Sequence, residues 1–122
     1  MMDRGMWHKS EQERCISRLA HRAAMRAYMG VRLNLTAAQK PLWDKLQSIA
    51  ENVEQQERQI CDKMKPDDAE TILDRMDARQ QMLQTAAAGL QDAKEPLAAF
   101  YKVLTPAQRA LLDHPHLQFH RG

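Results

Sequence analysis

Apolar residues recur at every seventh position through the C-terminal half of this chain. The members of this repeat are Ala69, Met76, Leu83, Leu90, Leu97 and Leu104. The slots between them hold Ile72, Ala86, Ala93 and Phe100, with Arg79 as the exception. An α-helix that packs along a seam has this period, whereas a half-buried β-strand alternates apolar and polar residues. The repeat therefore predicts one long helix from about Ala69, which Pro96 should kink by removing a backbone donor.

A second apolar series, spaced mostly by four and three residues, precedes the first. Its members are Leu42, Leu46, Ile49, Val53, Ile60 and Met64. Gly and Pro number only 4 and 5 among 122 residues, and aromatic residues make up 5%. A composition so poor in helix breakers favours an all-α fold. Residues 10–113 are expected to form one helical domain between flexible tails at residues 1–9 and 114–122.

The first helix is predicted to run from Ser10 to Met29. Ser10 is a favourable N-cap, Glu13 completes a capping box with it, and Gly30 is a stop signal. The two apolar series that follow are separated by a break at residues 65–67, after which Asp67 or Asp68 should cap the third helix. The two long helices joined there should form an antiparallel hairpin. One hairpin does not cover all of its own apolar seam, so we expect a homodimer in which a second copy covers the rest.

Two helix starts carry the same five-residue pattern, LTxxQ. The copies consist of Leu35, Thr36 and Gln39, and of Leu104, Thr105 and Gln108. In each copy the Thr hydroxyl can accept a hydrogen bond from the backbone N–H three residues on, the Gln side chain can bind back to the Thr N–H, and the Leu can pack on the helix. We expect the motifs to cap the second helix and a short fourth helix with Pro106 at its first position.

This motif pair, within roughly residues 10–113, resembles the Spy/CpxP family. The resemblance implies a periplasmic protein of four helices that forms a cradle-shaped antiparallel dimer and acts as an ATP-independent chaperone or a stress sensor. The partners it implies are unfolded client proteins and, in envelope stress, a membrane sensor protein. No signal-peptide pattern opens the chain, so an exported protein is expected in its mature form. The net charge of +2 does not suggest a nucleic-acid partner.

The first helix is locally basic. Arg14, Arg18, Arg22 and Arg26 recur at every fourth residue, Met25 and Met29 share their sector, and Arg32 follows. Arginine attracts acidic segments and methionine adapts to irregular apolar shapes, so this face is a candidate client-binding surface. The alternative is a solvated basic face. The opposite side, with Ile16, Ala20, Ala23 and Ala27, is expected to pack against the rest of the protein.

Potential metal ligands gather at the two ends of the chain. They are Met1, Met2, Met6 and His8 at one end and His114, His116 and His120 at the other. Methionine suits Cu(I) and imidazole suits Zn or Cu, and some relatives of the family bind metals. A periplasmic copper- or zinc-binding or metal-sensing protein is therefore the rival function. No CxxC pair or other strong metal-ligand spacing supports it, and the alternative is a disordered polar tail.

Cys15 and Cys61 are either a disulfide or two unpaired thiols. A first helix antiparallel to the second would bring Cys15 near residue 50, which is about eleven residues, or ~16 Å, from Cys61 along a helix. A disulfide needs Cα atoms within ~7 Å of each other. Simple hairpin geometry therefore argues against an intrachain bond, unless the helices are arranged differently or the bridge joins two subunits.

No enzymatic function is expected. The glycines Gly5, Gly30, Gly89 and Gly122 are isolated. Such spacing forms no phosphate-binding loop. Cys15 and His21 lie six positions apart and would point to different sides of a helix, so they do not form a nucleophile pair. No apolar run approaches the ~20 residues that a membrane-spanning helix needs.

Overall fold

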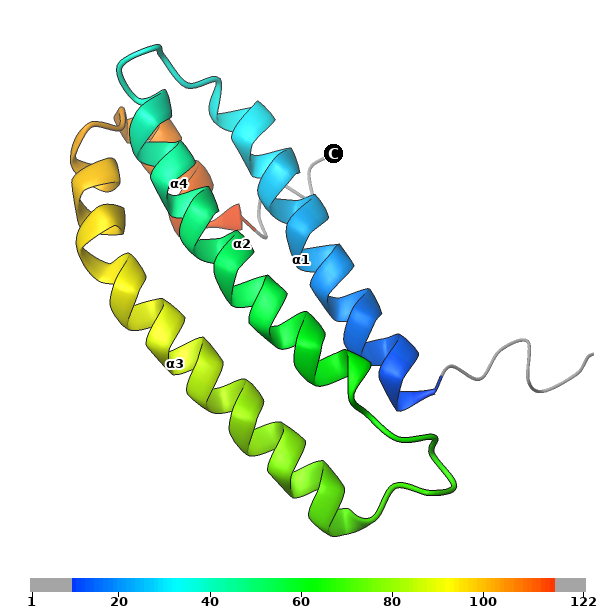
Figure 1. The fold of residues 1–122 in the computed structure, drawn as a ribbon. Coiled ribbons are helices and arrows are strands. Elements are labelled where there is room, and N and C mark those ends of the chain that lie inside the picture. The colour runs from blue at the N-terminus through cyan, green and yellow to red at the C-terminus, as the bar shows by residue number, and fades with distance from the viewer. Residues whose placement is uncertain (1–9, 116–122) are drawn as a thin grey trace, which may run out of the picture.

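Residues 10–115 are described by a computed structural model, and this segment contains four α-helices (Figure 1). They are α1 (Glu11–Leu33), α2 (Lys40–Asp62), α3 (Ile72–Lys102) and α4 (Pro106–Asp113). No strand occurs between residues 10 and 115, so the predicted all-α fold of four helices is confirmed. None of these four helices is long and apolar enough to cross a membrane.

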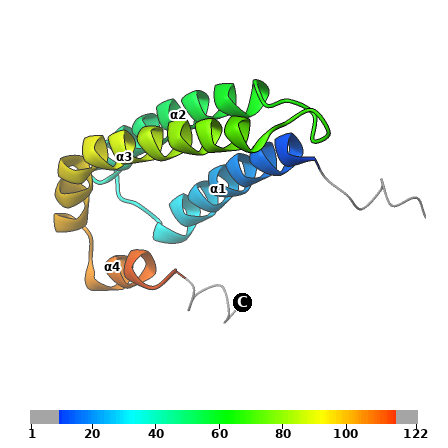
Figure 2. The ribbon, with the colours of Figure 1, turned by 90° about the horizontal axis from the view of Figure 1, so that it is seen from below.

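The helices are arranged as an arch. The α2 and α3 helices lie antiparallel in one layer, as the break between the two apolar series predicted (Figure 1). Both α1 and α4 lie on the same side of this layer, and the last turns of α3 bend toward that side (Figure 2). Pro96 lies inside α3 near this bend, where its ring removes one backbone hydrogen bond and crowds the preceding turn.

The α1 helix begins as predicted but ends later. The Ser10 hydroxyl accepts a hydrogen bond from the backbone N–H of Glu13 at 3.1 Å, which is the expected cap. The prediction that Gly30 ends the helix was wrong, because α1 continues to Leu33 and ends at Asn34, which adopts the left-handed conformation with φ 48°. Gly30 packs closely on α2, since a Cβ there would lie 3.2 Å from the indole of Trp43.

The start of α3 also differs from the prediction. Neither Asp67 nor Asp68 caps it, because residues 67–69 form a turn and the helix begins at Ile72. The cap is Thr71, whose hydroxyl accepts from the backbone N–H of Asp74 while the Asp74 carboxylate accepts from the Thr71 N–H at 2.9 Å. The Thr71 backbone and hydroxyl bonds, with a smaller contribution from Lys65, lower the pKa of the Asp74 carboxyl.

The hydrophobic core lies at one end of the arch, where α1 meets α2 and α3 meets α4. Leu33, Phe100 and Leu104 are buried there. The ring of Phe100 lies 5.6 Å from that of Trp43, centroid to centroid. Half-buried residues packed on this core are Met29, Leu35, Leu42, Leu46, Leu111 and Leu112. Leu35 and Leu104, the leucines of the two motifs, therefore pack beside their helices as predicted.

The short α4 helix is tied back to the end of α3. The Tyr101 hydroxyl donates to the Asp113 carboxylate at 2.7 Å, and this bond raises the pKa of the Tyr101 phenol. The guanidinium of Arg109 lies 4.9 Å from the centre of the Tyr101 ring and donates to the Tyr101 carbonyl at 3.0 Å. These contacts hold the middle and the C-terminal end of α4 against the end of α3, on the inner side of the arch.

Candidate functional site

The two LTxxQ motifs meet in the fold through their glutamines. Nε2 of Gln39 donates to Oε1 of Gln108 at 2.9 Å, and Nε2 of Gln108 donates to Oε1 of Gln39 at 3.0 Å. The second donor of each amide binds a backbone carbonyl, Val103 at 2.8 Å for Gln39 and Leu33 at 3.0 Å for Gln108. Both side chains are buried, so these bonds hold the α1–α2 connection against the α3–α4 connection.

Each glutamine also closes the capping box of its own motif. The Oε1 atoms accept from the backbone N–H groups of Thr36 and Thr105 at 3.0 and 2.9 Å, and the Thr hydroxyls accept from the glutamine N–H groups at 3.2 Å. The predicted cap of α4 at Thr105 is confirmed, but the prediction that Thr36 caps the second helix was wrong, because the N-cap position of α2 is Gln39. In the first motif the box closes a turn, and α2 begins one residue after it, at Lys40.

The pairing explains why the motif ends in Gln. A capping box needs only an acceptor at this position, and Glu would serve equally well. The amide pair needs two donors as well as two acceptors from each side chain, and only an amide supplies both. Sequence reasoning treated each motif as an independent cap and missed this contact. The repetition of Gln, rather than Glu, was the available signal.

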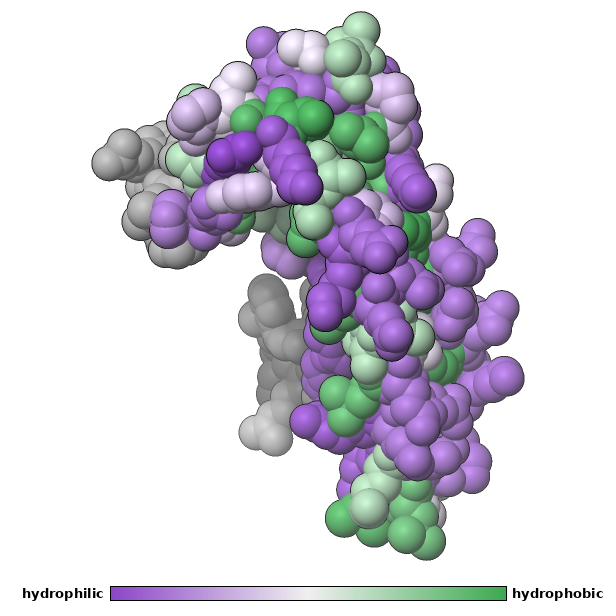
Figure 3. All heavy atoms as spheres, turned by 90° about the vertical axis from the view of Figure 1, so that its left-hand side faces the viewer, coloured by the Kyte–Doolittle hydropathy of each residue, from purple (hydrophilic) through white to green (hydrophobic). Residues whose placement is uncertain are grey.

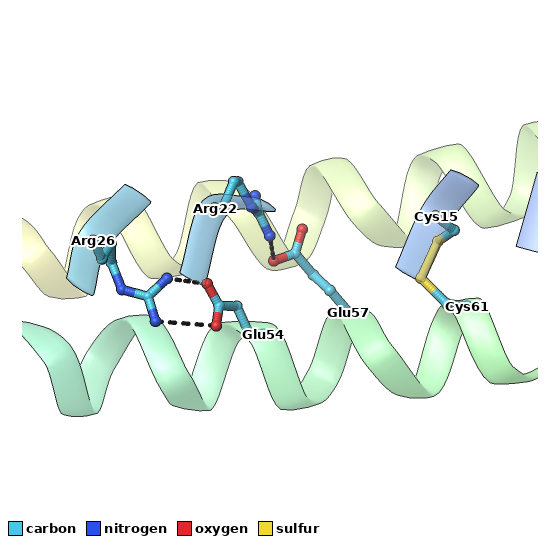
Figure 4. Close-up of polar contacts among 6 residues, drawn as sticks. All are labelled: Cys15, Arg22, Arg26, Glu54, Glu57 and Cys61. Carbon is cyan, nitrogen blue, oxygen red and sulfur yellow. Dashed lines mark hydrogen bonds and ion pairs between the residues drawn. A yellow bond between two sulfur atoms is a disulfide. The ribbon is translucent and has the colours of Figure 1, made fainter. Parts of the chain in front are cut away.

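The middle of α1 is held on α2 by ion pairs (Figure 4). The Arg22 guanidinium pairs with Glu57, whose side chain is buried. The guanidinium of Arg26 binds both carboxylate oxygens of Glu54, and its Nη2 lies 3.1 Å from Oε1. Nε of Arg26 also donates to Oε1 of Gln47 at 2.9 Å. A forked guanidinium–carboxylate pair fixes orientation as well as distance.

A disulfide between Cys15 and Cys61 fastens the N-terminal end of α1 to the C-terminal end of α2 (Figure 4). The Cα atoms lie 5.7 Å apart, so the geometric argument against an intrachain bond was wrong. It placed the end of the first helix at Met29 and the start of the second near Thr36. Because α1 extends to Leu33 and α2 starts only at Lys40, the register shifts and brings Cys61 opposite Cys15.

A groove of about 420 Å³ lies between α1 and α3, with α2 behind it. Its apolar lining comes from Leu19, Ile60, Met64, Ala78 and Met82. Its arginines are Arg18 and Arg22 from α1 and Arg75 and Arg79 from α3. Its carboxylates are Glu11, Glu57 and Glu70. The predicted basic face of α1 thus supplies only one wall, and the α3 arginines of the other wall were missed because they lie some 55 residues away in the sequence.

The heptad repeat of α3 faces solvent. Exposed members of the repeat and its neighbours are Ile72, Leu73, Met76, Leu83, Leu90 and Leu97, which we call the α3 stripe. Leu83 and Leu90 are 58% and 71% exposed. Figure 3 shows apolar side chains at intervals along this side of the molecule, separated by hydrophilic ones.

Small residues, rather than the heptad leucines, pack α3 on α2. Gly89 is buried, and a Cβ there would lie 2.5 Å from Cγ2 of Val53, so no larger side chain fits without movement. Ala78, Met82 and Ala93 on the same side of α3 are half-buried. The hairpin therefore leaves most of the α3 repeat uncovered, as expected, and fully buries only Phe100 and Leu104 of it.

The predicted client-binding residues divide into two groups. Arg18 is exposed and lines the groove, whereas Arg22 and Arg26 are engaged in the ion pairs with α2. Arg14 pairs with Glu11. Met25 and Met29 are half-buried, and Arg32 is exposed in the last turn of α1. The predicted packing face was partly wrong, because Ala20 and Ala27 are exposed while Ile16 and Ala23 are half-buried.

The predicted metal ligands fall mostly outside residues 10–115. Met1, Met2, Met6, His8, His116 and His120 are not among the described residues. His114 follows α4 and is exposed. Within the described segment no three His, Cys, Asp or Glu side chains are grouped so that they could hold a metal ion. The two cysteines are bonded to each other, so metal binding by the tails stays a prediction.

Comparison with known proteins places the chain in a family. No curated protein and no solved structure matches it. The family model described as "LTXXQ motif family protein" matches residues 21–116, which include both glutamines of the buried amide pair and more than half of the chain. The chain therefore belongs to the LTXXQ motif family, the Spy/CpxP-like family that its two motifs indicated.

Proposed function

We propose that this protein is a periplasmic, ATP-independent chaperone that holds unfolded or aggregation-prone client proteins. The observation that carries the proposal is the groove between α1 and α3, which combines an apolar floor with arginines on both walls. Unfolded chains expose apolar side chains and charged groups together, and a surface that offers both can bind many sequences weakly. Family membership supports the same function, because it makes the protein a helical, chaperone-like or metal-resistance type of protein.

The side chains of the groove suit clients of variable shape. Met64 and Met82 are flexible and polarisable, so they can adapt to different apolar groups. Arg18 and Arg79 carry permanent charge and can stack on aromatic rings as well as pair with carboxylates. The groove is a partly open cleft and not an enclosed cavity, so an internal segment of a client chain can bind in it.

A second copy of the chain is the proposed partner of the α3 stripe. The six stripe residues are 47–73% exposed. Burying a large apolar side chain completely contributes about 1.5–3 kcal/mol, so covering the remaining surface of two stripes contributes roughly 10–20 kcal/mol. The estimated cost of association is about 4–15 kcal/mol, so the gain exceeds the cost over most of the two ranges.

Charge reversal in the groove tests the chaperone proposal. In the Arg18→Glu/Arg79→Glu variant we expect weaker suppression of aggregation of a thermally unfolded client, measured by light scattering at several chaperone-to-client ratios. Lys40→Glu is the matched control, because Lys40 is exposed and lies outside the groove. Circular dichroism should show the same helix content in both variants. Unchanged suppression by the groove variant, or equal loss in the control, would refute the proposed site.

A further inference from the structure

Within residues 10–115, three arginines of the groove have no partner for their charge. Arg22 is neutralised by Glu57, and Glu11 by Arg14. The side chains of Arg18, Arg75 and Arg79 make no ion pair or hydrogen bond within residues 10–115.

Of the carboxylates that line the groove, only that of Glu70 forms no ion pair within residues 10–115, so it alone opposes the charge of these three arginines. One Glu70 oxygen is buried and has no hydrogen-bond partner among the described residues. The groove therefore keeps an excess of positive charge directly beside apolar surface. This arrangement is complementary to a ligand that carries both a negative charge and an apolar part.

The unpaired arginines come from both walls. Arg75 and Arg79 lie four residues apart on α3, so their side chains point to the same side of that helix. Arg18 stands on α1, across the groove from them. A single anionic group between the walls can be reached from both helices, and guanidinium groups bind carboxylate and phosphate through paired N–H donors.

The space between the walls suits a small molecule. The volume of about 420 Å³ falls within the range of roughly 300–1,000 Å³ that is typical of small-molecule sites. The apolar floor consists of Leu19 from α1, Ile60 from the C-terminal end of α2 and Met82 from α3, and Met64 lies just beyond the end of α2. Flexible aliphatic side chains from three helices can adapt to a hydrocarbon chain laid across them.

We propose that this groove binds a single-chain anionic amphiphile. Its acyl chain lies on the floor of Leu19, Ile60 and Met82, and Arg18, Arg75 and Arg79 bind its carboxylate or phosphate head. A fatty acid and an anionic lysophospholipid share this chemistry. The site does not depend on the chaperone proposal, because the ligand is a small molecule and its binding needs no client.

Displacement of a fluorescent fatty acid tests the site. The full chain is titrated with a dansyl-labelled undecanoic acid below its micellar concentration, and oleate, lysophosphatidylglycerol and uncharged oleyl alcohol are added as competitors. Oleate or lysophosphatidylglycerol should displace the probe, and oleyl alcohol should not. Displacement by only one of the two anions would identify the head group. Equal displacement by oleyl alcohol would overturn the proposal, because the arginines would then contribute nothing.

Matched variants locate the binding. In Arg75→Gln/Arg79→Gln the affinity for the probe should fall roughly tenfold or more, since two charge-assisted contacts are lost. In Leu83→Gln/Leu90→Gln, which alters the α3 stripe and leaves the groove intact, the affinity should be unchanged. Loss in the stripe variant with retention in the arginine variant would show that the probe binds exposed leucines instead, and would overturn the proposal. Both variants are exposed substitutions, and circular dichroism confirms that they fold.

Discussion

The substitution Gln39→Glu separates the two roles of the motif glutamine. A carboxylate at this position can still accept from the Thr36 N–H and from Nε2 of Gln108, so the capping box remains possible. It cannot donate, so the Val103 carbonyl loses its side-chain partner, and Oε1 of Gln108 keeps only the hydrogen bond from the Thr105 N–H. The substitution therefore tests the amide pair and not the cap.

The expected loss of stability follows from the burial of the pair. Gln39 is 6% exposed and Gln108 is 9% exposed, so water does not replace the missing donors. The Val103 carbonyl left without a partner costs about 1–3 kcal/mol, and the hydrogen bond lost at Oε1 of Gln108 adds about 1 kcal/mol, so the free energy of unfolding should fall by roughly 2–4 kcal/mol. Facing oxygens add repulsion, so we expect about 4 kcal/mol.

Urea unfolding followed by circular dichroism at 222 nm measures this loss. The control is Thr36→Ala, which removes the cap hydroxyl and should cost only about 1 kcal/mol. Protonation of the new carboxyl restores one donor, so the deficit of the Gln39→Glu variant should shrink as the pH falls from 7 toward 4. A loss below about 0.5 kcal/mol, or one that grows on acidification, would refute the argument.

A double-mutant cycle tests the contact directly. Gln39→Ala and Gln108→Ala each leave the other amide unpaired, whereas the double variant removes both amides at once. The double variant should therefore lose less stability than the sum of the single variants, with a coupling of about 1–3 kcal/mol. Additive losses would show that the two motifs act as independent caps.

Three further predictions concern other parts of the fold. Reduction of the Cys15–Cys61 disulfide, which spans 46 residues, should lower the free energy of unfolding by about 4 kcal/mol, and denaturation with and without reductant measures this. Leu83→Gln/Leu90→Gln should shift the proposed dimer to a monomer of unchanged helix content, so an unchanged mass in light scattering would contradict the α3 interface. The Asp74 carboxyl should titrate below its ordinary pKa of 3.8. Its contribution to stability is therefore present above pH 3.8 and is lost as the pH falls through the lower pKa of the folded state. An ordinary pKa for Asp74, measured by NMR, would show that the Thr71 capping box is not formed.

Local signals in the sequence predicted much of the fold. The apolar spacing predicted the helices, and the chemistry of Ser10 and Thr105 predicted the caps of α1 and α4, because each cap depends on atoms only three residues apart. The box at Thr36 forms as well, but it closes a turn and does not cap α2. The hairpin followed from the break at residues 65–67. The boundaries at Gly30 and Asp67 were wrong because stop and cap signals compete with packing and with better caps, here the space beside Trp43 and the Thr71 capping box.

The candidate site was only half predictable. The sequence pointed to Arg18 and Arg22 because a four-residue spacing places side chains on one side of a helix. In the structure Arg18 is exposed in the groove, whereas Arg22 pairs with the buried carboxylate of Glu57. Arg75 and Arg79 belong to the site only because the arch brings α3 opposite α1. Spacing along a chain contains no information about charges on another helix.

The sequence alone thus determined the helical class, the starting points of α1 and α4, and the family, since these depend on interactions between residues within one or two turns. Only the tertiary structure decided the pairing of Gln39 with Gln108, the Cys15–Cys61 bond and the exposure of the α3 stripe. Each of these depends on the register and rotation of one helix against another. A shift of four residues in either helix end moves a contact by about one turn, or ~6 Å, which is enough to make or break a disulfide.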